Sequence, residues 1–116
     1  MSIEDIINKY SCNTEWSNTD NLYRCKINVN EIFYVSIIAG AGAYSDPQTM
    51  LSDFSHYDLY EIAFFDMENK WLKVTPEDCN CTAVTYKRYS PTDTWGSVAP
   101  FEIEDAINAL LEAWQG

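Results

Sequence analysis

Carboxylates dominate the ionisable side chains of this chain, and they are unevenly spaced. The 116 residues hold 18 acidic and 7 basic side chains, which gives a net charge of −11. No lysine or arginine lies between Lys26 and Lys70. The acids inside that stretch are Glu31, Asp46, Asp53, Asp58, Glu61, Asp66 and Glu68. A surface with many carboxylates can imitate the phosphates of a nucleic acid and occupy a basic groove built for DNA or RNA.

The candidate partner-binding residues combine these acids with aromatic residues expected in or beside loops. They are Asp46, Asp53, Asp58, Glu61, Asp66, Glu68, Tyr44, Tyr60 and Trp95. Tyrosine and tryptophan are enriched at the residues that dominate binding energy in protein interfaces. Trp16 lies in a polar segment, where we expect it to cover the core. Direct nucleic-acid binding is disfavoured because phosphate contacts need clustered lysine and arginine, so a basic protein partner is favoured. The alternative is an acidic, solvated surface with no specific partner.

The sequence contains no pattern that predicts catalysis, a metal or a cofactor. His56 is the single histidine, and Cys79 and Cys81 have one residue between them where zinc sites have two or more. Paired carboxylates are frequent in any acidic chain and therefore indicate little. We expect a non-enzymatic protein with reduced cysteines, although pairing of Cys25 with Cys79 or Cys81 stays open.

A glycine-containing loop, from Gly40 to Pro47, is a second candidate binding site. Glycine lets backbone approach a ligand, and Asp46 and Pro47 have the residue types of a helix start, whose N-terminus can bind an anion. The loop lacks G-x-G-x-x-G and a P-loop lysine, so a plain turn is favoured. If it does bind, the protein would be a sponge for a nucleotide signal or small ligand, using this loop and the bases of residues 70–88.

The hydrophobic pattern predicts a helix at each end of the chain and strands between them. Ser2 is the expected N-cap of the first helix, and Pro100 is the expected first residue of the last. Alternation and β-branched or aromatic residues predict strands at residues 22–29, 32–39, 57–66, 71–74 and 79–89. Residues 11–21 and 90–99 are expected to be loops. One or two helical turns are expected after Asp46.

These elements predict an α+β fold of one compact domain over residues 1–116. About five strands would form a mainly antiparallel sheet, and both terminal helices would pack on one face of it. The hydrophobic fraction of 47% excludes a disordered chain. No signal peptide is expected after Met1, and the longest apolar stretch is too short to span a bilayer, so we expect a cytoplasmic protein.

At the level of class, the chain resembles the small, acidic, phage-encoded inhibitors of bacterial defence, the anti-CRISPR and antirestriction proteins. Its length, the base-free stretch of residues 27–69 and the lack of a catalytic pattern carry this resemblance. The resemblance implies host-defence evasion in the cytoplasm of a bacterial host, by blocking the basic groove of a defence nuclease or effector. It assigns no individual residue. An immunity protein against a nuclease toxin would have the same acidity and is the alternative.

Overall fold

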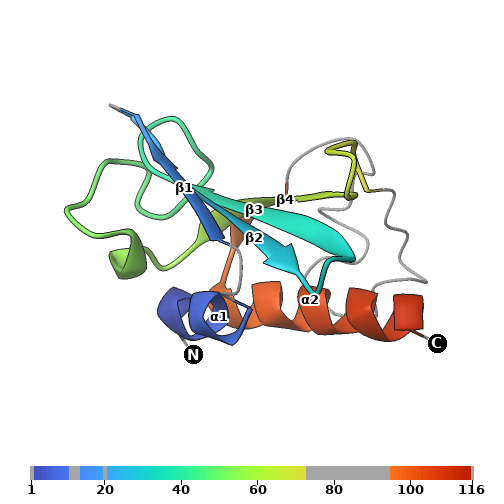
Figure 1. The fold of residues 1–116 in the computed structure, drawn as a ribbon. Helices are drawn as coiled ribbons and strands as arrows, with labels where there is room; N and C mark the ends of the chain where they lie inside the picture. The colour runs from blue at the N-terminus through green and yellow to red at the C-terminus, as the bar shows by residue number, and fades with distance from the viewer. Residues whose placement is uncertain (1, 11–13, 20, 73–94, 116) are drawn as a thin grey trace.

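A five-stranded antiparallel sheet forms the centre of the structure, a computed structural model that describes residues 2–10, 14–19, 21–72 and 95–115 (Figure 1). The elements are α1 (Ile3–Lys9), β1 (Thr14–Asn18), β2 (Tyr23–Val29), β3 (Phe33–Ala39), the 3-10 helix η2 (Phe54–His56), β4 (Tyr60–Phe65), β5 (Trp95–Val98) and α2 (Pro100–Gln115). The strands follow one another across the sheet in the order β1-β2-β3-β4-β5. The predicted α+β class and antiparallel sheet are confirmed.

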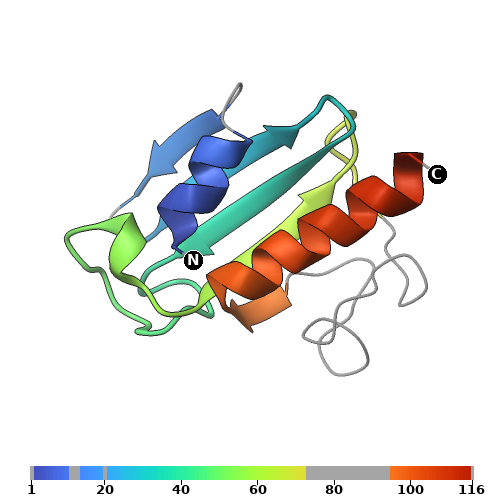
Figure 2. The ribbon, with the colours of Figure 1, turned by 90° about the horizontal axis from the view of Figure 1, so that it is seen from below.

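Both terminal helices lie on the same face of the sheet, as expected (Figures 1 and 2). They also contact each other. Lys9 of α1 forms an ion pair of 2.8 Å with Glu104 of α2, and the Tyr10 hydroxyl donates to Asn108 Oδ1 at 2.9 Å. Within the ranges that the structure describes, no helix has the length and apolar character needed to cross a membrane.

The core lies between the sheet and the two helices. In register across the sheet, Cys25 pairs with Ile37, Ile37 with Ile62 and Ile62 with Trp95, and all four side chains are buried. Neighbouring residues point to the opposite face because side chains alternate along a strand. The burial of β3 follows this alternation, with every second residue buried.

Both helices begin at the predicted residues. The Ser2 hydroxyl accepts the Asp5 N–H and the Asp5 carboxylate accepts the Ser2 N–H, which completes a capping box for α1. In α2, which begins at Pro100, Glu102 Oε1 accepts the Ala99 N–H at 2.9 Å. Among the described side chains of the helices and the C-cap of α1, the buried ones are Ile3, Ile6, Tyr10, Ile103, Ala106, Ile107 and Leu110.

Two strands arise from segments predicted to be loops. β1 lies within the polar segment 11–21, and β5 lies within residues 90–99, so the loop predictions are wrong over residues 14–18 and 95–98. Of the predicted fourth strand, Trp71 forms an isolated bridge with Phe65, and Leu72 N–H donates to the Phe64 carbonyl. Residues 73–74 of that fourth strand and the predicted strand at 79–89 lie outside the described residues.

The predicted helical turns after Asp46 do not form. Asp46 instead makes a β-bridge with Leu59, and residues 47–53 have no helical structure. Tyrosine hydroxyls hold this segment: Tyr57 donates to the Thr49 carbonyl at 2.6 Å, and Tyr23 donates to the Leu51 carbonyl at 2.5 Å. These tertiary hydrogen bonds outweigh the local preference of the Asp-Pro pair for a helix start.

Candidate partner-binding surface

Strand β4 divides the predicted acidic residues between two ends of the sheet. We call the end where residues 40–59 join β3 to β4 the loop end, and the end at residues 66–71 the turn end (Figure 1). Asp46, Asp53 and Asp58 belong to the loop end, and Asp66 and Glu68 to the turn end. Since a strand rises roughly 3.3 Å per residue, the two ends of β4, Tyr60 and Phe65, are about 16 Å apart, and the two groups of acids lie beyond these ends. The acids therefore do not form one continuous surface.

The loop end presents its carboxylates to solvent. Asp46, Asp53 and Asp58 are all exposed, and the backbone N–H of Asp58 donates to the Asp46 carbonyl at 2.8 Å. The Asp53 carboxylate accepts the Ser55 hydroxyl at 2.7 Å and the Ser55 N–H at 2.8 Å. Hydrogen bonds from Ser55 lower the pKa of Asp53, so this group stays ionised at neutral pH. Tyr44 at this end is 66% exposed.

Two of the predicted partner-binding acids have structural roles instead. Glu61 is buried, and its Oε1 accepts the Tyr44 N–H at 2.9 Å. Asp66 Oδ1 accepts the N–H groups of Glu68 and Lys70 at 2.8 and 3.0 Å, and so fixes the turn after β4. The Glu68 side chain is exposed and lies 3.1 Å from Lys70 Nζ.

Two of the predicted aromatic contacts lie in the core. Tyr60 has no exposed surface, and its hydroxyl donates to the Phe54 carbonyl at 2.5 Å. Trp95 is 2% exposed, and its ring packs against Phe64 with centroids 4.9 Å apart. Both side chains therefore offer no surface to a partner, because they point to the helix-covered face of β4 and β5.

The glycine loop uses its backbone donors within the protein. Gly40 N–H donates to Ser45 Oγ, Gly42 N–H to the Asn21 carbonyl and Ala43 N–H to the Gly40 carbonyl. Gly40 has a φ of +134°, and a Cβ there would lie 2.6 Å from Asn21 O. This position needs glycine for the turn and for close backbone packing. Since no helix follows the loop, it lacks the anion site that the sequence suggested.

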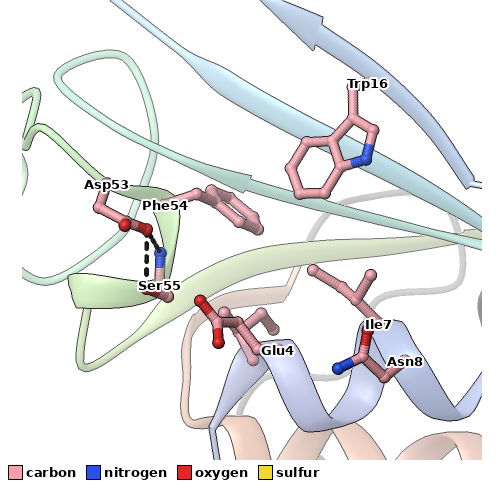
Figure 3. Close-up of a pocket in the computed structure, with 8 residues that line it drawn as sticks. Glu4, Ile7, Asn8, Trp16, Asp53, Phe54 and Ser55 are labelled. Carbon is pink, nitrogen blue, oxygen red and sulfur yellow. Dashed lines mark hydrogen bonds between the residues drawn. The ribbon is translucent and has the colours of Figure 1, made fainter.

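A pocket that no sequence pattern indicates opens beside β1, between α1 and η2 (Figure 3). Its volume is about 290 Å³. The lining residues are Ile3, Glu4, Ile7, Asn8, Trp16, Asp53, Phe54 and Ser55. The sequence predicts that Trp16 covers the core, but its side chain is 53% exposed, and its ring makes an edge contact with Phe54 at 5.5 Å between centroids. The position of Trp16 opposite α1 depends on strand β1, which the sequence does not predict.

Metal and thiol chemistry have no built site in the described part of the chain. No group of three or more His, Cys, Asp or Glu side chains there could hold a metal ion. Cys25 is a buried free thiol, so the proposed bridge from it is not formed, and burial raises its pKa to about 12. The other three cysteines lie outside the described residues.

No protein-family model, curated protein or solved structure matches this chain. No residue role is therefore transferred from a relative.

Proposed function

We propose that this chain is a non-enzymatic binding protein that inhibits a nucleic-acid-handling bacterial protein by occupying its basic surface. The partner would be a defence nuclease or effector in the cytoplasm of the bacterial host. The acidic side chains of the loop end would replace the phosphates that the partner normally binds.

The observation that supports this proposal is the exposed acidity of the loop end. Asp46, Asp53 and Asp58 are exposed there, in a stretch that contains no lysine or arginine. Their negative potential is not cancelled within the stretch, and such a potential speeds association with a basic surface. The exposed Tyr44 ring adds apolar area beside these charges.

The function is tested by capture from a bacterial lysate, with a pair of charge-matched variants. In the first variant, Asp46→Asn and Asp58→Asn remove two loop-end charges. In the control, Glu31→Gln and Asp105→Asn remove two exposed charges elsewhere. We expect the control and the native chain to retain a nucleic-acid-binding protein at low salt. The loop-end variant should lose it, and high salt should release it because the Debye length shrinks below about 10 Å above roughly 0.1 M.

An experiment with the purified partner then distinguishes inhibition of nucleic-acid binding from association without inhibition. Addition of the native chain should displace DNA or RNA from the partner in a gel-shift experiment, and the loop-end variant should displace much less. A partner that binds the chain and its nucleic acid at the same time would contradict the proposal. Equal capture by both variants would show that the loop end is not the contact.

A further inference from the structure

We infer that the pocket between α1, β1 and η2 receives a single arginine side chain of the basic partner, between the indole of Trp16 and the carboxylates of Glu4 and Asp53. This inference deepens the proposed function and rests on it, because it names the group that the acidic protein recognises. The pocket chemistry follows from three features: an apolar floor, an exposed aromatic wall and an acidic rim.

The floor and wall of the pocket suit the apolar part of a long side chain. Ile3 and Phe54 are almost fully buried and Ile7 is partly buried, so they form a fixed surface at the base. The Trp16 ring extends from β1 over this floor, opposite Ile7 of α1 (Figure 3). The methylene groups of an arginine would pack against this apolar surface while its charged end stays near solvent.

The rim of the pocket carries negative charge and no basic side chain. Glu4 of α1 and Asp53 before η2 lie on its rim, and the eight lining residues include no lysine or arginine. The hydrogen bonds from Ser55 fix the Asp53 carboxylate in place. Lys9, the base nearest in sequence to the lining residues of α1, is held by Glu104 of α2 at 2.8 Å. Lys9 therefore does not neutralise Glu4 or Asp53. The base that acts on Asp53 is the exposed His56, which helps Ser55 to lower the pKa of that carboxylate.

The charge of the pocket favours a cationic side chain over a nucleotide, and its size admits only a small group. A volume of about 290 Å³ is at the lower limit of the roughly 300–1,000 Å³ found for small-molecule sites. A nucleotide would also bring phosphates towards two carboxylates, which repel them. Arginine fits better than lysine because its planar guanidinium stacks on an aromatic face and donates hydrogen bonds in several directions at once.

The test uses short glycine-serine peptides with one variable residue, added to the full chain. The variable residue is arginine, its neutral isostere citrulline, or the apolar norleucine. Binding is followed through the indole N–H resonance of Trp16 in ¹H–¹⁵N spectra, identified by its loss in Trp16→Phe. We expect the arginine peptide to shift this resonance saturably, and the two neutral peptides to bind at least about tenfold more weakly.

Two variants examine the rim and the wall separately. Glu4→Gln with Asp53→Asn should weaken the arginine peptide about tenfold or more, while asparagine keeps an oxygen that can accept the Ser55 hydrogen bonds. Trp16→Leu keeps an apolar side chain and should weaken it severalfold, measured through the Ile7 methyl resonances. The control with Glu31→Gln and Asp105→Asn should bind like the native chain.

Three outcomes would overturn the inference: an unmoved Trp16 resonance, equal binding of citrulline or norleucine, or unchanged binding in the rim variant. The lysate experiment separates this failure from failure of the function. A partner that is lost with Asp46→Asn and Asp58→Asn, yet kept with the rim variant and Trp16→Leu, would leave the function standing and remove the pocket from it. If the arginine peptide binds but the lysate yields no nucleic-acid-binding partner, the arginine pocket would stand and the proposed function would fail.

Discussion

On β3, Ile37 and Ile38 are neighbours in sequence but lie on opposite faces of the sheet. Ile37 faces the helices and has no exposed surface, whereas Ile38 is partly exposed. The same contrast holds along β2, where Cys25 is buried and Lys26 is partly exposed on the other side. The helix-facing side is apolar across β2, β3 and β4, and the opposite side mixes charged, polar and aromatic residues.

The packed core and the pocket of Trp16 therefore share one side of the sheet. The helix-facing side joins strands and helices into one core, so its residues are fixed by packing. The pocket of Trp16 lies at the rim of that same side, where α1 does not cover β1 completely. A rigid floor beneath an exposed aromatic ring is a suitable base for binding because it reorganises little when a partner arrives.

The largest effect should come from truncating the helix-facing side. Ile37→Ala removes buried methyl groups and leaves a cavity, which should lower the free energy of unfolding by about 2–5 kcal/mol. Ile38→Ala on the opposite side should cost about 1 kcal/mol or less, since part of that side chain already contacts water. Urea unfolding followed by circular dichroism measures both. Equal losses of unfolding free energy in the two variants would show that both sides of the sheet are equally buried, contrary to the difference described above.

The α+β class and both helices could be predicted because their signals are local. Ser2 and Pro100 mark the helix starts, and the spacing of Ile3, Ile6 and Tyr10 marks the buried stripe of α1. β2 and β3 show the alternation or β-branched run that a half-buried or central strand requires. Each of these patterns can be recognised without knowing any partner in the fold.

The candidate site could not be predicted in the same way because it depends on pairing between distant segments. β1 has the sequence TEWSN, in which four of five residues are exposed, so it lacks an apolar alternation. Pairing of Trp16 with Cys25 turns the indole towards α1, and no local signal contains that information. Tyr60 and Trp95 were misplaced for the same reason, since burial of an aromatic residue depends on what covers its strand.

A second effect, dependent on pH, should come from the buried thiol on the helix-facing side. Burial raises the pKa of Cys25 from 9.0 to about 12, so the folded state keeps a proton that the unfolded state releases between these values. The unfolded state then binds fewer protons, and stability falls as pH rises from about 9 towards 12, by at most about 1.4 kcal/mol per pH unit.

Cys25→Ala is the matched variant for this prediction. Urea unfolding at several alkaline pH values should show a shallower decline for Cys25→Ala than for the native chain, because every other titrating group is shared. Parallel declines would mean that the thiol is accessible to water in the folded state. That result would mean that water reaches the buried, helix-facing side of the sheet near Cys25.

The smallest effect should come from the opposite side, where a cation lies over aromatic rings. Lys26 Nζ lies 4.5 Å from the centroid of Tyr34 and 5.8 Å from that of Phe65, and it also donates to Asn69 Oδ1. A partly exposed cation–π contact contributes about 0.5–1 kcal/mol. In a double-mutant cycle with Lys26→Gln and Tyr34→Leu, we expect a coupling free energy of about 0.5 kcal/mol between the two positions.

The same two variants also sharpen the contrast between the faces. Neither position lines the pocket between α1, β1 and η2, although Lys26 lines a second hollow on the other side of Trp16, so both variants should bind the arginine peptide as the native chain does. If Lys26→Gln tightened that binding, its charge would act across the sheet on Glu4 and Asp53, and the two sides would be electrostatically coupled. A coupling free energy of zero in the cycle would instead mean that the Tyr34 ring does not stabilise Lys26 beyond the hydrogen bond of Lys26 to Asn69.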